Sequence, residues 1–175
     1  MSDLPPGFEP HSRFDFFEPG DKTAMICVDV PEMQRIIITQ LDELGYKMHT
    51  GLFVDDSVLK LRTHTYDVVV LSEHFQGATL ENHPIIAEAI STAASQRRRQ
   101  VYVFVGASAV TNDDLLAFYY NVDVVVSLED IMNLKPVVRR AVNSTTEFYG
   151  PLHEVLAAVN AEELGLRRPA APGIR

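Results

Sequence analysis

The sequence has one cysteine, no tryptophan and fewer basic than acidic residues. Cys27 has no second cysteine to pair with, which excludes an internal disulfide and a cysteine-rich zinc site. One cysteine and the lack of a secretory signal peptide are typical of a reducing compartment, so we expect a cytoplasmic protein.

The shortage of basic residues bears on the class of partner. Lys and Arg number 15 against 24 Asp and Glu, which gives a net charge of -9. Nucleic-acid binding depends on neutralising phosphates with Lys and Arg, so we expect no nucleic-acid partner. The sequence also lacks a GxGxxG motif and a P-loop. No apolar run reaches the roughly 18 residues of a membrane helix, so we expect no membrane insertion.

What remains has a globular composition, with 46% hydrophobic and 22% charged residues in 175. This length predicts one compact domain of about 130 residues with tails. We expect Phe14, Phe16 and Phe17 to lie on the domain surface. The predicted units are a Pro/Phe-rich lead (1–22), the main domain (23–149), a helical extension (150–166) and a flexible tail (167–175).

Within the main domain, short apolar runs alternate with helical periodicity. The predicted strands are residues 24–28, 46–52, 68–71, 101–105 and 122–126. The predicted helices begin at Pro31, at Asp55 or Asp56, at Pro84, at Asn112 or Asp113, and near Pro136, and they end at Gly45, Arg62, about Gln96, Tyr120 and Tyr149. Gly150-Pro151 is expected to break the last of these, with a separate helix over residues 152–164.

This alternation predicts an α/β fold, namely a flavodoxin-like, doubly wound, five-stranded parallel sheet of order 2-1-3-4-5 with an extra C-terminal helix. Ligands of such sheets bind beyond the carboxyl ends of the strands. The residues there are Asp29, Ser72-Glu73, Gly106-Ala107-Ser108 and Ser127-Leu128.

Two segments, Cys27–Met33 and Tyr66–Leu71, resemble a response-regulator receiver domain, the CheY-like module of bacterial two-component signalling. The resemblance covers residues 23–149. It implies a metal-binding acid pair at Val28 and Asp29 and a phosphoacceptor at Ser72. It further implies a hydroxyl position at Gly106 followed by a small residue, Ala107, a lysine position at Leu128 (or Ser127 with a one-residue shift) and an aromatic switch at Val125. Lys135-Pro136 resembles the family's Lys-Pro pair but lies too far along the chain to reach the site.

Most of these positions lack the chemistry that the family uses. Phosphoryl transfer to a carboxylate needs the carboxylate, a metal and a cation on the phosphate oxygens. We therefore interpret the chain as a degenerate pseudo-receiver that is not an enzyme and uses no cofactor. The alternatives are a rearranged metal site of Asp29 and Glu73, and unusual chemistry at Ser72. Asp29 equally suits a helix cap or a bond to a loop amide.

Other reactive residue types have simpler interpretations. Cys27 lies within a strand and is expected to be a small buried hydrophobe. His74 and His83 flank the loop after the third strand, and we expect them on the loop surface rather than in a catalytic or metal site. Arg97-Arg98-Arg99 ends a helix, which favours cations, and docking on an acidic partner is the alternative.

The short helix after residue 113 carries more large apolar side chains than one stripe can bury. We therefore predict a protein-binding face, unless the C-terminal helix or the Phe-rich lead covers it. Leu152, Val155, Leu156 and Val159 have helical spacing and could pack within the chain or against a second copy, as in a homodimer. The predicted face comprises Leu116, Phe118, Tyr119, Tyr120, Val125, Val137 and Arg140.

The favoured function is a signalling module that works by protein–protein binding without phosphorylation. The alternative is a sensor or enzyme that binds a nucleotide or another anion in the cleft at the carboxyl ends of the strands. Asp29, Ser72, Glu73 and Ser108 would line that cleft.

Overall fold

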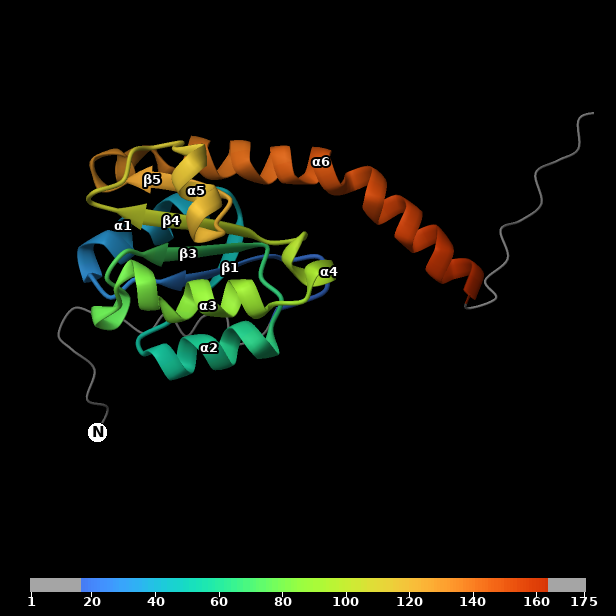
Figure 1. Cartoon of the computed structure of the whole chain (residues 1–175), viewed down its shortest axis with the longest axis horizontal. Coiled ribbons are helices and arrows are strands. Elements are labelled where there is room, and N and C mark those ends of the chain that lie inside the picture. The colour runs from blue at the N-terminus through green and yellow to red at the C-terminus, as the bar shows by residue number, and fades with distance from the viewer. Residues whose placement is uncertain (1–16, 164–175) are drawn as a thin grey trace, which may run out of the picture.

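The computed structural model describes residues 17–163 (Figure 1). The five strands are β1 (Lys22–Cys27), β2 (Tyr46–Thr50), β3 (Val68–Ser72), β4 (Val101–Gly106) and β5 (Val124–Ser127). The helices are α1 (Pro31–Asp42), α2 (Val54–Thr63), α3 (Pro84–Ser91), α4 (Ala94–Arg97), α5 (Asp114–Tyr120) and α6 (Leu134–Glu163). Short 3-10 turns cover Phe75–Gly77, Leu80–Asn82 and Leu128–Asn133.

All five strands run parallel in the order β2-β1-β3-β4-β5, which confirms the predicted topology. The central strand β3 has all five residues buried, as its continuous apolar run predicts. Alternate side chains enter two cores. Val68 and Val70 face the α1/α6 side, whereas Val69 and Leu71 face the side of α2, α3 and α5 (Figure 1).

The helix starts follow local chemistry in part. Pro31 and Pro84 each lie in the first turn of a helix, where the missing amide has no helical partner to lose. The predicted cap of α2 by Asp55 or Asp56 is wrong, because α2 begins after Phe53 and both acids lie within its first turn. The predicted cap of α5 is confirmed at Asp113, whose carboxylate accepts the Leu116 amide at 2.9 Å.

Two predicted helices have different extents. The helix expected from Pro84 to about Gln96 divides into α3 and α4, and the Thr92 hydroxyl beyond α3 donates to the Glu88 carbonyl at 2.8 Å. The helix expected near Pro136 begins at Leu134, directly after a 3-10 turn.

The predicted helix break at Gly150-Pro151 is wrong, since α6 continues through Pro151 to Glu163. The C-terminal helix is therefore present, but as an outward continuation of α6 that projects past the sheet (Figure 1). Pro151 removes only one amide donor, and both Pro151 and Glu147, whose carbonyl loses that donor, are exposed, so water can replace the lost bond.

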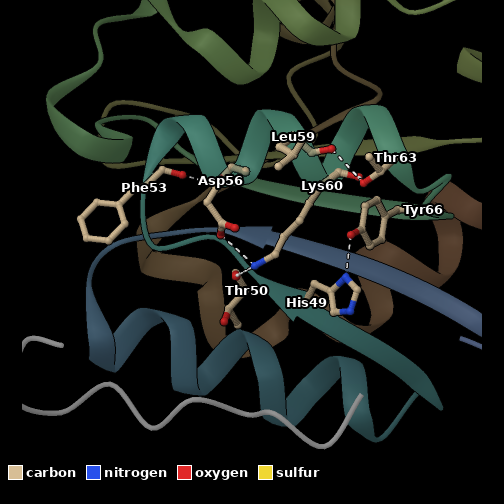
Figure 2. Close-up of polar contacts among 9 residues, drawn as sticks. His49, Thr50, Phe53, Asp56, Leu59, Lys60, Thr63 and Tyr66 are labelled. Atoms are coloured by element: carbon tan, nitrogen blue, oxygen red, sulfur yellow. Dashed lines mark hydrogen bonds and ion pairs between the residues drawn. The ribbon is translucent and has the colours of Figure 1, made fainter. Parts of the chain in front are cut away.

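Figure 2 shows the polar contacts around helix α2 and the end of β2. Lys60 donates to the Thr50 carbonyl at 3.1 Å and pairs with Asp56 at 2.8 Å, while His49 Nδ1 lies 2.7 Å from the Tyr66 hydroxyl (Figure 2). Phe17 packs against His49 at 4.4 Å between ring centroids and against the core, so the prediction for Phe17 is confirmed. The predictions for Phe14, Phe16 and the 167–175 tail lie outside the described residues.

Candidate functional site

The parallel sheet brings the predicted site residues to one edge. Cys27 pairs with Leu71, Ser72 with Val105, and Gly106 with Ser127. The residues that follow β1, β3, β4 and β5 therefore start at nearly the same level of the sheet. The sequence order alone predicts this meeting, because the carboxyl ends of parallel strands share an edge.

Ser72, at the phosphoacceptor position of the resemblance, is 5% exposed. Its hydroxyl oxygen is buried and has no hydrogen-bond partner among the described residues. Val28, at the first acid position, is fully buried and has no polar side chain. Neither side chain therefore supplies a negative charge at this edge.

Asp29 is the remaining acid after β1. Its carboxylate accepts the backbone amide of Gln76 at 2.9 Å. Gln76 adopts a left-handed conformation with φ of 54°, within the turn that follows β3. Asp29 therefore braces this turn, which is the loop-amide alternative considered for it above.

Glu73 directly follows Ser72 and is half-buried. One carboxylate oxygen accepts the Ala107 amide at 2.9 Å, and the other accepts the Ser108 hydroxyl at 2.8 Å. The two acids of this edge thus bind two different loops. Among the side chains that the structure describes, residues 17–160, no three His, Cys, Asp or Glu form a group that could hold a metal ion.

The lysine position after β5 carries no cation. Leu128 is partly exposed and begins a 3-10 turn, while the Ser127 hydroxyl accepts the Glu129 amide at 3.3 Å. Lys135 pairs with Glu43 at 2.7 Å, on the α1 side. The edge therefore presents two carboxylates that are already hydrogen-bonded and no lysine.

The expectation that His83 lies on the loop surface is wrong, since His83 is 2% exposed. Its Nε2 lies 2.9 Å from the Ser72 carbonyl oxygen, which can only accept, so Nε2 carries the proton. Burial lowers the pKa of His83, which keeps the ring neutral. Nδ1 is buried without a partner among the described residues. His74, in contrast, is exposed.

Cys27 is buried within β1. Burial raises the pKa of its thiol to about 12, and this effect exceeds the opposing hydrogen bond from Ser57. The thiolate is therefore absent at neutral pH, and Cys27 cannot act as a nucleophile.

The residues of the predicted interaction face do not all lie on the surface. Leu115, Phe118 and Tyr119 lie on one side of α5 and are 78%, 85% and 78% exposed. Leu116 and Tyr120 turn inward and pack against the core, where the Tyr120 ring stacks on Phe104 at 5.6 Å.

The other predicted face residues differ in exposure. Val125 is fully buried in β5, so its inclusion in the face is wrong, because helices cover both sides of that strand. Val137 and Arg140 line a hollow of about 320 Å³ between α5 and α6, together with Asn112, Asp114 and Asp123.

No protein-family model and no curated protein match this sequence. Solved structures do match in fold. A CheY-like receiver domain from Methanospirillum hungatei has a TM-score of 0.57 at 10% identity, covering 73% of this chain and 98% of its own. The fold is that of a response-regulator receiver domain. The receiver domain of a Francisella response regulator gives 0.56 at 14% identity, covering 71% and 99% of the two chains. The receiver domain of a Colwellia psychrerythraea DNA-binding response regulator gives 0.56 at 18%, covering 70% and 99%.

These receiver domains cover about 70% of the chain, so part of it lies outside the shared fold. No helix within the described residues is long and apolar enough to span a bilayer. Sequence reasoning missed the contacts of Glu73 and the burial of His83. The only signal for the former is the run of small residues at 106–108, which leaves backbone amides accessible.

Proposed function

We propose that this chain is a receiver-fold signalling module that binds another protein without phosphorylation and performs no catalysis. The supporting observation is the exposed side of α5, formed by Leu115, Phe118 and Tyr119. Large aromatic side chains are enriched in protein interfaces, and an exposed cluster on a seven-residue helix is costly without a partner. We expect the partner to be a cytoplasmic signalling protein with an apolar surface.

Independence from phosphorylation rests on the residues at the carboxyl edge. Ser72 offers a hydroxyl where a receiver has its acceptor carboxylate, and Leu128 offers no cation for phosphate oxygens. We expect no amide shifts near Asp29, Ser72 and Gly106 when the protein is titrated with Mg²⁺ and then with beryllofluoride, an acyl-phosphate mimic. Saturable shifts that reach Phe118 would contradict phosphorylation independence.

The docking side of α5 is tested with Phe118→Asp. A protein retained by the immobilised chain from its native extract is purified and titrated against wild type and variant. Truncating an interface hot spot costs about 2 kcal/mol, so we expect roughly 30-fold weaker binding. Leu59→Asp on α2 is the control, since Leu59 is also exposed and lies elsewhere. The proposal fails if no protein is specifically retained, or if Phe118→Asp binds as tightly as Leu59→Asp.

We further propose that the projecting half of α6 associates with a second copy. In the first half of α6, the apolar residues that pack on the domain are spaced alternately by four and three residues. The exposed apolar residues of the projecting half continue this spacing, so one apolar stripe runs along the whole helix. The stripe comprises Leu134, Val138, Ala141, Phe148, Leu152, Val155 and Val159.

A second copy is the occupant that fits this stripe. The flanking positions carry no charge, and Glu147 and Glu154 lie off the stripe, so two acidic chains can approach along it. The same spacing on both helices allows side chains to interdigitate. We expect the helix pair to bury less surface than a standard protein interface, which buries about 1,600 Å². The dimer should therefore be weak, and its population should depend on concentration.

A further inference from the structure

Glu73 contacts a loop that lies 34 residues away in the sequence. Its two carboxylate oxygens bind different donors, the Ala107 amide at 2.9 Å and the Ser108 hydroxyl at 2.8 Å. A backbone amide and a hydroxyl that converge on one carboxylate form an oxyanion cradle, and hydrogen bonds to an ionised acceptor are stronger than neutral ones. The cradle is therefore occupied by the chain's own anion.

Gly106, directly before the cradle, leaves space for the Glu73 carboxylate. A Cβ atom at this position would lie 2.9 Å from the bonded Glu73 oxygen and 2.8 Å from the Phe104 ring. Real Cβ atoms do not approach so closely, so any larger residue here would displace the carboxylate or the ring. Glycine at position 106 thus leaves room for the Glu73 carboxylate beside the loop.

The same place is connected to the docking helix. The Phe104 ring beside Gly106 stacks on Tyr120 of α5 at 5.6 Å, and Tyr120 contacts Tyr119 at 5.1 Å between ring centroids. Burial raises the pKa of Tyr120, and the neighbouring Tyr119 and the charges of Glu73 and Glu81 add to this effect. Glu73 thus lies close enough to act on α5 through the loop and the stacked rings.

We propose that Ala107 and Ser108 form a binding site for a small carboxylate or phosphate, that Glu73 fills this site in place of a free anion, and that its occupancy holds α5 in its docking arrangement. The regulatory part rests on the proposed function, because it takes the α5 face as the docking surface. The test uses no docking partner, so its failure leaves docking itself untouched.

The test is chemical rescue in Glu73→Ala, with sodium acetate and inorganic phosphate as separate probes. The readout is the backbone amide spectrum of the full chain at constant ionic strength. We expect the Ala107 amide and the α5 amides to shift when Glu73 is removed. Acetate or phosphate should then return them towards their wild-type positions with millimolar saturation, in the range of weak small-ligand binding. Wild type should show no saturable shift with either probe.

Glu81→Ala is the matched control. It removes one negative charge from the same region, but Glu81 is exposed, and the Ala107 amide and the Ser108 hydroxyl donate to Glu73 instead. We expect smaller shifts of the α5 amides than in Glu73→Ala, because only the charge is lost, and no response to acetate. Saturable acetate binding by wild type or by Glu81→Ala at the Ala107 amide would overturn the proposal.

Ser108→Ala keeps the test decisive if Glu73→Ala does not fold. This variant removes one of the two donors and leaves the carboxylate bound to the Ala107 amide. We expect the Ala107 amide and the α5 amides to shift together. Unchanged α5 amides in Ser108→Ala would show that the cradle does not act on the docking helix. A folded Glu73→Ala that binds neither probe would overturn the anion site itself.

Discussion

At the scale of single residues, the two carboxylates at the carboxyl ends of the strands are hydrogen-bonded to the chain's own loops. Asp29 and Glu73 each accept a backbone amide from a loop, and Glu73 accepts the Ser108 hydroxyl as well. Each bond offsets the cost of holding an ionised group where it is partly removed from water. Both acids therefore hold loops at this edge of the receiver fold.

His83 leads to a prediction about pH. Burial lowers its pKa in the folded state, with the charge of His74 adding to this and the Ser72 carbonyl opposing it. The unfolded chain takes up a proton near the ordinary value of about 6.5, whereas the folded chain does so only at lower pH. His83 therefore contributes stability above pH 6.5 that is lost as the pH falls. We expect the free energy of unfolding in urea to fall more between pH 7.5 and 5.5 in wild type than in His83→Gln.

His83→Gln is the appropriate comparison because its side-chain amide can still donate to the Ser72 carbonyl but does not titrate. All other titrating groups are shared, so the difference between the two pH dependences reports on His83. Equal slopes, or a steeper loss in His83→Gln, would contradict this account.

At the scale of elements, α5 and α6 each have more apolar surface than the domain covers. Helix α5 has seven residues between the Asp113 cap and Asn121, which takes a left-handed conformation with φ of 56°. A helix this short buries one side, which leaves Leu115, Phe118 and Tyr119 outside. In α6 the first half packs on the core, while the second half passes beyond the sheet (Figure 1).

The stripe on α6 is tested with Val155→Glu. A charge in the middle of a helix pair would be buried without a partner, so we expect the dimer to dissociate. Ala157→Glu adds the same charge on the opposite side of the helix and should leave association unchanged. Sedimentation equilibrium across a range of concentrations gives the two dissociation constants. A wild-type chain that stays monomeric at high concentration would disprove the α6 dimer, as would equal constants for the two variants.

At the scale of the whole molecule, we expect the core and the projecting helix to be separable. Core contacts of α6 end at Val142, and the residues beyond the 149–150 boundary contribute none of the buried hydrophobic residues. We expect a chain that ends at Tyr149 to melt within a few degrees of the full chain, since it loses no core packing. Differential scanning calorimetry at low concentration measures this. A large drop in melting temperature would contradict a domain boundary at this position.

The fold could be predicted because its signals are local. Continuous Val-rich runs such as 68–71 are typical of strands buried on both faces, and Pro31 and Asp113 indicate where helices begin. The right-handed crossover between parallel strands leaves few arrangements for five such units. The strand order of the sheet can therefore be predicted from the alternation of strands and helices and from the parallel direction of the strands.

The sequence by itself determined the strand order, the edge where a site could form, and the serine, Ser72, at the end of the central strand. Only the tertiary structure decided that Glu73 meets Ala107 and Ser108, that His83 is buried, and that α6 continues through Pro151. The physical reason is the distance along the chain over which each signal acts. Periodicity and helix caps act over a few residues, whereas the contacts of Glu73 join segments far apart in the chain. The continuation of α6 through Pro151 depends on whether water can reach the backbone carbonyl that loses its donor.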